Sequence, residues 1–260
     1  MAIETVLLLA AAFDLPLRQA EGFARSILTL VNLDLPVPDH TTLARRRRTV
    51  TLDMHAPGRT APVDLMLDST GLKFFGPGEW ARLKHDEKRR DWRKLYISVD
   101  AGTGEILSHF LTNSDTSDAA MAGPLVETAG GRIRTVIADG AYYGASVAAA
   151  IRNARPATSP PKIIIPPPRT AIPPPRTPHG GTERECHVAE IGAYGRIACP
   201  SRTEYGKRSL AEAAISCLTS RGRKILRTRT NSAQCREIGS HIAAANKAIR
   251  HAKPVTVRVL

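Results

Sequence analysis

The stretch Val63-Asp-Leu-Met-Leu-Asp-Ser-Thr-Gly71 joins a short apolar run to an acidic residue and three residues that favour turns. An apolar run of this length, bounded by turn residues, is typical of a buried β-strand. The same pattern recurs at Thr135-Val-Ile-Ala-Asp-Gly140. Asp68 and Asp139 are therefore expected at the ends of two strands. Their alternative role is turn formation, but two carboxylates at adjacent strand ends make a site for Mg²⁺, which prefers oxygen ligands.

The elements around these two strands predict a mixed α/β sheet with flanking helices. Strands are expected over 63–67, 95–99, 106–111, 135–138 and 162–165, and helices over about 118–128 and 145–153. The turn Asp100-Ala-Gly-Thr-Gly104 predicts an antiparallel hairpin. Asp115 or Ser117 is expected to cap the first of these helices. The order β-β-β-α-β-α-β is that of a mixed sheet.

Residues 1–60 predict a small helical region of their own. Apolar residues recur at helical spacing from Ile3 to Leu33, with a break at Pro16 that predicts two helices. Asp39 or Thr41 is expected to cap a short third helix that leads into the run Arg45–Arg48. The apolar residues 6–13 are too few for a membrane span and predict a buried helix.

A third carboxylate lies on a helix predicted over Ser209 to about Ser220. Tyr205, Arg208 and Glu212 stand at i, i+3 and i+7, which places them on one helical face. The simple alternative is an ion pair between Arg208 and Glu212 within the helix. A further helix is predicted over 232–249.

The charge of the chain indicates a polyanionic partner. Its 260 residues contain 37 Lys and Arg against 24 Asp and Glu, a formal net charge of +13. Basic side chains gather in 82–94 and in 201–260, which favours nucleic acid over a membrane surface or a merely solubilising surface. The four cysteines form no CxxC pair, so neither a zinc site nor a disulfide framework is expected.

A proline-rich segment lies before the helix of Glu212. It contains the tandem repeat Ile165-Pro-Pro-Pro-Arg-Thr170 and Ile172-Pro-Pro-Pro-Arg-Thr177. Such a segment is extended and cannot lie inside a sheet. We expect a surface linker, with an SH3-like partner as the alternative.

Several ordered motifs together resemble the DDE transposases of bacterial insertion sequences, in the branch with a Tyr-x2-Arg-x3-Glu-x6-Lys signature. The motifs are Asp68-Ser-Thr-Gly-Leu-Lys73, Gly76, Gly78-Glu-Trp80, Lys84-His85, Trp92-Arg-Lys-Leu95, Val99-Asp-Ala, Thr103-Gly-Glu-Ile106, Ala138-Asp-Gly-Ala-Tyr142 and Tyr205-Gly-Lys-Arg-Ser-Leu-Ala-Glu212. The resemblance spans residues 13 to 260. It implies an RNase H-like catalytic domain over 61–260, with an insertion at about 166–203 before the Glu-bearing helix. Residues 1–60 would then be part of a DNA-binding or dimerisation region.

The resemblance also implies the roles of individual residues. Asp68, Asp139 and Glu212 would be catalytic and would hold two Mg²⁺ or Mn²⁺ ions, which activate a water and stabilise the leaving 3′ oxygen. Tyr205 and Arg208 would position the DNA end. Basic residues expected to bind phosphates are Lys73, Lys84, Arg89, Arg90, Arg93, Lys94, Arg223, Lys224 and Arg227. Double-stranded DNA would be the partner of a homodimer in the bacterial cytoplasm, associated with the nucleoid and not with a membrane.

Three departures from the family pattern weaken the expected activity. Thr219 stands where the signature has Lys, and Cys199 stands where relatives carry a Trp. The N-terminus is also shorter than in relatives, which suggests a truncated or decaying copy. The alternative function is therefore a catalytically weak or inactive DNA-binding remnant. A metal-dependent nuclease of the same fold differs from a transposase in that it does not join the 3′-OH to target DNA.

Overall fold

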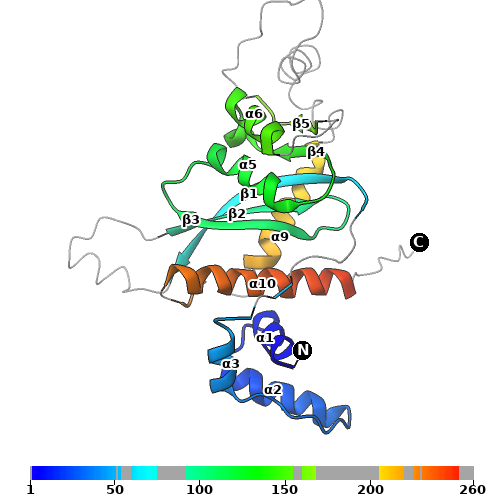
Figure 1. Cartoon of the computed structure of the whole chain (residues 1–260), viewed down its shortest axis with the longest axis vertical. Helices are drawn as coiled ribbons and strands as arrows, with labels where there is room; N and C mark the ends of the chain where they lie inside the picture. The colour runs from blue at the N-terminus through cyan, green and yellow to red at the C-terminus, as the bar shows by residue number, and fades with distance from the viewer. Residues whose placement is uncertain are drawn as a thin grey trace, which may run out of the picture. The chain divides into compact units, whose positions relative to one another are not determined.

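The computed structural model describes residues 2–50, 52–53, 60–74, 92–154, 160–167, 205–219, 225–228 and 230–251. Helices are α1 Ala2–Ala12, α2 Leu17–Leu30, α3 His40–Arg46, α5 Asp118–Ala129, α6 Ala145–Ala154, α9 Ser209–Thr219 and α10 Asn231–His251, with 3-10 turns η1 Gly140–Tyr142 and η2 Tyr205–Arg208. Strands are β1 Val63–Phe74, β2 Trp92–Asp100, β3 Ile106–Asn113, β4 Ile133–Ala138, β5 Lys162–Ile164 and β6 Ile225–Leu226 (Figure 1).

The chain forms two compact units whose segments alternate along the sequence. The sheet unit comprises Ala56–Gly71 and Lys94–Ser216, and the helical unit comprises Met1–His55, Leu72–Arg93 and Cys217–Leu260. The boundary expected near residue 60 stays a prediction. Almost all of the expected insertion, and most of the proline repeat, lies outside the described residues.

The sheet has the strand order β3-β2-β1-β4-β5, with β6 paired to β1. Strands β1, β4 and β5 are parallel to one another. The expected hairpin of β2 and β3 is confirmed, since a connection of five residues between neighbouring strands allows only an antiparallel pair. Its turn needs Gly104, whose φ of 80° is in the left-handed region. The amide of Ala101, just after β2, donates to the carbonyl of Asp64 near the start of β1, so β2 also runs antiparallel to β1.

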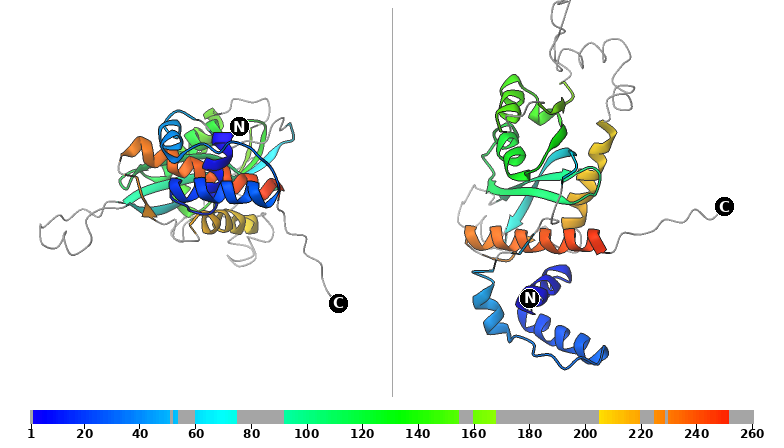
Figure 2. Two further views of the ribbon diagram at one scale, coloured as in Figure 1. Left: turned by 90° about the horizontal axis from the view of Figure 1, so that it is seen from below. Right: turned by 45° about the vertical axis from the view of Figure 1, so that its right-hand side comes forward.

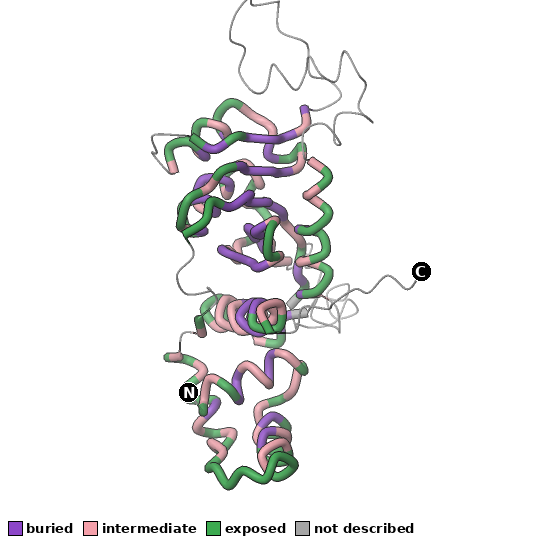
Figure 3. The backbone as a smooth tube through the Cα atoms, turned by 90° about the vertical axis from the view of Figure 1, so that its right-hand side faces the viewer, coloured by how far each residue is buried: buried purple, intermediate pink, exposed green. Residues whose placement is uncertain are grey.

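The sheet unit has the RNase H-like α/β fold that the sequence predicts. Helices α5 and α6 cover one face of the sheet, and α9 lies on the other face (Figure 2). Val63, Leu65 and Leu67 of β1 point into the core cluster under α5 and α6, and Figure 3 shows the buried stretches following the strands. Because side chains alternate along a strand, Asp64 and Asp68 project toward the opposite face. Ser117 is the observed cap of α5, accepting the amide of Ala120.

The first three helices of the helical unit form as predicted. Pro16 is the N-cap of α2, which confirms the break between α1 and α2. Their small core includes Leu7 of α1, Ala20 of α2 and Leu43 of α3. No helix within the described part of the chain has the length and apolarity needed to cross a membrane.

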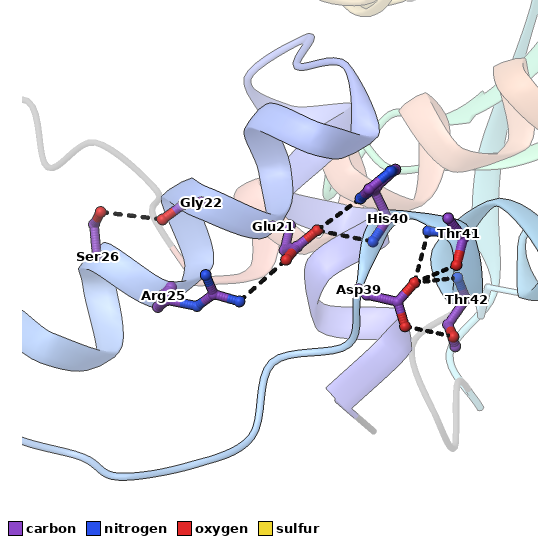
Figure 4. Close-up of polar contacts among 8 residues, drawn as sticks. All are labelled: Glu21, Gly22, Arg25, Ser26, Asp39, His40, Thr41 and Thr42. Carbon is purple, nitrogen blue, oxygen red and sulfur yellow. Dashed lines mark hydrogen bonds and ion pairs between the residues drawn. The ribbon is translucent and has the colours of Figure 1, made fainter.

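Polar contacts tie α3 to α2 in this unit (Figure 4). The carboxylate of Asp39 accepts the amides of Thr41 and Thr42 at 2.9 Å each and so caps α3. Hydrogen bonds from Thr41 and Thr42 hold the pKa of Asp39 far below its ordinary value. Glu21 of α2 accepts the backbone amide of His40 at 2.9 Å, which fixes the start of α3 on α2.

Candidate active site

Asp68 lies inside β1 and not at its end, which corrects the expectation of a strand over 63–67. The parallel pairing of β1 with β4 stops at Leu67 and Ala138, but β1 continues to Phe74 beside β2, and its last two residues pair with β6. This long-range pairing overrides the turn preference of Ser69-Thr-Gly71. The register nevertheless places Asp68 and Asp139 directly after the last pair of residues that β1 and β4 share. The two carboxylates therefore emerge at one edge, as expected.

Burial distinguishes the two aspartates. The side chain of Asp68 is 10% exposed and that of Asp139 is 32% exposed. Burial raises the pKa of Asp68 above its ordinary value, and the carboxylates of Asp139 and Glu212 act in the same direction. The amide of Ser69, which donates to Asp68 at 2.9 Å, and the guanidinium of Arg208 oppose this rise. Asp139 accepts the amide of Ala141 at 2.9 Å and thereby caps η1.

The third acid comes from the segment after the insertion. Tyr205 and Arg208 lie on η2, and α9 begins only at Ser209, so the expected single helical face is part 3-10 and part α. In a 3-10 turn residues i and i+3 eclipse, so Tyr205 and Arg208 still align. Glu212 sits in the first turn of α9 with its side chain 58% exposed. The ion pair of Arg208 with Glu212 is present at 3.1 Å.

The guanidinium of Arg208 lies among all three carboxylates. Its Nη2 atom is 3.9 Å from Oδ1 of Asp68 and 3.8 Å from Oδ2 of Asp139, and its Nη1 atom is 3.1 Å from Glu212. Only the last contact has hydrogen-bond length. The Nε atom of Arg208 is buried and has no hydrogen-bond partner among the described residues.

The three carboxylates favour the charged form of Arg208. Burial acts to lower the pKa of Arg208, but Tyr205 and the three carboxylates outweigh it, so the pKa is raised. Tyr205 shares a hydrogen bond with Arg208, while burial raises the pKa of the Tyr205 phenol. Within the described residues, no group of three potential ligands is placed to hold a metal ion. The carboxylates have the donor chemistry of a Mg²⁺ site, but a guanidinium occupies the space between them.

The basic residues predicted to contact DNA have protein partners where the structure describes them. Lys94 pairs with Asp118 at 3.0 Å in the sheet unit. In the helical unit, Arg93 donates to Gln234 at 3.1 Å, Arg227 pairs with Asp14 at 2.7 Å, and Lys73 lies over the Trp92 ring at 5.2 Å. Lys84, Arg89, Arg90, Arg223, Lys224 and Cys199 lie outside the described residues. A contact of any of these side chains with DNA stays a prediction.

Asp64, which lies four residues before Asp68 on β1, was not among the residues predicted from the sequence. Its buried carboxylate accepts from Arg134 at 2.8 and 2.7 Å and from Lys207 at 3.0 Å. The hydrogen bond of Arg134 chiefly, with that of Lys207, holds the pKa of Asp64 far below its ordinary value. An acid between apolar residues of a buried strand was the available signal, because a buried charge needs a partner.

Comparison with protein-family models gives two matches, both described as a transposase DDE domain. One match covers residues 1–77, and the other covers residues 59–247, well over half of the chain. The second match contains every residue of the site described above.

Proposed function

Because this chain belongs to the transposase DDE domain family, we propose that it cleaves the ends of an insertion sequence and joins the freed 3′-OH to target DNA. Members of the family are enzymes of DNA cleavage and strand transfer. The observation that carries the proposal is the convergence of Asp68, Asp139 and Glu212 on one guanidinium. Three acids gathered around a single cation form a site in which a bound divalent ion would find oxygen ligands.

Asp68, Asp139 and Glu212 are the residues that would hold Mg²⁺ or Mn²⁺, two ions per site. Bound there, the ions would supply a nucleophilic hydroxide and stabilise the charge of the leaving 3′ oxygen. Their binding requires Arg208 to leave the space between the carboxylates. Asp68 is the most buried of the three, and burial opposes ionisation of its carboxylate. A bound ion would stabilise the charged form, so the setting of Asp68 favours an occupied site.

Arg208 is suited to hold a DNA phosphate once it leaves the carboxylates. Its Nε is without a hydrogen-bond partner among the described residues, and two of its three contacts are too long for hydrogen bonds. A guanidinium binds phosphate oxygens in pairs, which would replace these loose contacts with short ones. Tyr205, which is hydrogen-bonded to Arg208, would orient it toward the DNA strand being cut.

The partner in this proposal is double-stranded DNA, both at the element ends and at the target. A homodimer follows from the need to bring two ends together, and the place of action would be the nucleoid in the bacterial cytoplasm. The basic residues 73–94 and 223–227 would add sequence-independent phosphate contacts.

The test is a strand-transfer assay with labelled element ends and a supercoiled target in Mg²⁺ or Mn²⁺. Nicking followed by joined products supports the transposase, while nicking without joining indicates a nuclease of the same fold. Salt-dependent DNA binding that survives Asp68→Asn, with no nicking by the unaltered chain, would support the alternative of a DNA-binding remnant. That alternative draws on Thr219 and Cys199, which depart from the family pattern.

A further inference from the structure

We propose that Asp64 is a positioning residue, which sets the place of Arg208 and Glu212 by holding Lys207. This inference rests on the proposed function for its activity readout, but its structural readout does not. Asp64, Arg134 and Lys207, here called the Asp64 cluster, all belong to the sheet unit. None of the three is part of the Tyr-Arg-Glu-Lys signature.

The Asp64 cluster places two cations on one buried acid. The side chain of Asp64 is 5% exposed, whereas those of Arg134 and Lys207 are 65% and 38% exposed. A carboxylate so buried needs its counter-charges, because an unpaired buried charge is strongly unfavourable. Asp64 therefore fixes both cations more firmly than an exposed acid would.

The two cations differ in what they connect. Arg134 is on β4, which is already paired with β1 in a register that sets Asp64 opposite Thr135. Its contact adds little to the placement of β4. Lys207 is on η2, between Tyr205 and Arg208, and its contact joins that turn to β1 at 3.0 Å.

Lys207 and Arg208 together attach η2 to β1 at two points. Asp64 and Asp68 are on the same face of β1, about 13 Å apart along the strand. Lys207 meets the first acid and Arg208 approaches the second, at 3.9 Å. The Lys207 contact is the shorter of the two, so it resists sliding or rotation of η2 more strongly than the Arg208 contact does. Glu212 follows because α9 continues directly from η2.

The experiment compares Lys207→Gln with Lys207→Arg and Arg134→Gln in the full chain. Each Gln variant removes one cation from the same carboxylate, and Arg134 holds it by two hydrogen bonds where Lys207 holds it by one, but only Lys207 is on η2. The structural readout is the side-chain Nε–H NMR signal of Arg208 in protein labelled with ¹⁵N-arginine and assigned with Arg208→Lys. The functional readout is cleavage of a labelled element end with Mn²⁺, separated into kcat and KM.

We expect Lys207→Gln to shift the Arg208 signal and to lower kcat about tenfold, with KM changed less than about twofold, since misplacement affects the reacting geometry more than binding. Lys207→Arg should restore both readouts. Arg134→Gln should leave both near the values of the unaltered protein, even where its melting temperature falls as much as that of Lys207→Gln.

An unchanged Arg208 signal in Lys207→Gln overturns the positioning role, whether or not the protein cuts DNA. Equal losses in Lys207→Gln and Arg134→Gln also overturn it, since they indicate stability alone. Absence of cleavage by the unaltered chain contradicts the proposed function instead, and the NMR comparison then decides the role of Asp64.

Discussion

Asp64 and Asp68 are two buried acids on the same face of one strand, and their electrostatic settings are opposite. Asp64 has two cations within 3.0 Å and a depressed pKa, whereas Asp68 has one guanidinium at 3.9 Å and a raised pKa. The first acid is fully satisfied by the protein, and the second is not. The difference separates a carboxylate paired within the protein from one whose charge is only loosely balanced, which is the setting expected of a ligand for the proposed ions.

Asp68→Asn should produce the largest change. Loss of a ligand for the proposed ions should lower Mn²⁺-dependent cleavage by about a thousandfold, equivalent to about 4 kcal/mol. The free energy of unfolding at pH 7 should stay the same or rise, because a raised pKa means that the fold disfavours the charged form. Urea unfolding beside the cleavage assay measures both. A marked loss of stability would make Asp68 a structural acid like Asp64.

Asp64→Asn should lower stability, besides the loss of kcat expected when Lys207 loses its carboxylate. The change leaves Arg134 and Lys207 without their carboxylate, and we expect the free energy of unfolding to fall by about 2 kcal/mol. This is less than for a fully buried pair, because both cations are partly solvated. Asp34→Asn, at an exposed aspartate, serves as the control in the same urea titration. Equal stability of the two variants would contradict the structural role of Asp64.

Arg208→Gln should tighten Mn²⁺ binding by about fivefold, near 1 kcal/mol, because a cation no longer competes among the three acids. Cleavage should not rise, since the proposed phosphate contact would be lost with the guanidinium. Mn²⁺ titration followed by electron paramagnetic resonance gives the affinity. Arg25→Gln is a matched control, because Arg25 forms the same kind of i, i+4 pair at 3.1 Å with Glu21. Weaker Mn²⁺ binding in Arg208→Gln would contradict competition between the Arg208 guanidinium and Mn²⁺ for the three carboxylates.

The smallest effect concerns pH. Asp64 has a folded pKa below its ordinary 3.8, so its contribution to stability is present above that value and is lost as the pH falls below it. Asp68 has a raised pKa, so its penalty is present at neutral pH and disappears as the pH falls toward 3.8. Urea unfolding from pH 7 to 3 should show the gap between the protein and Asp64→Asn narrowing by about 1 kcal/mol. A difference in unfolding free energy that widens as the pH falls would contradict a lowered pKa for Asp64.

Much of the fold could be predicted because its signals are local. Apolar runs marked the strands, and Pro16, Asp39 and Ser117 marked helix boundaries that the structure confirms. The length of β1 could not be predicted in this way. The end of its second half, Lys73 and Phe74, pairs with β6, which lies more than 150 residues later in the sequence. Local turn preference at Ser69-Thr-Gly71 gave no indication of that pairing.

The residues of the candidate site likewise divide into those predicted from local sequence patterns and those placed by tertiary contacts. The three acids could be predicted from two strand patterns and one helical spacing. The Asp64 cluster could not, since its partners are 70 and 143 residues away in sequence. The position of Arg208 among the acids is also tertiary, although its pair with Glu212 was visible as an i, i+4 spacing.

The graded exposure of the three carboxylates, 10% for Asp68, 32% for Asp139 and 58% for Glu212, has a consequence in conformational entropy. Asp68 loses its rotamer freedom when the chain folds, so binding one of the proposed ions would cost it little more. Glu212 keeps much of its freedom in the folded protein, and fixing it costs up to about 2 kcal/mol at the moment of binding. Under the proposed function Glu212 would be the ligand that adjusts on binding, and the entropic cost of ordering it would fall on cooling.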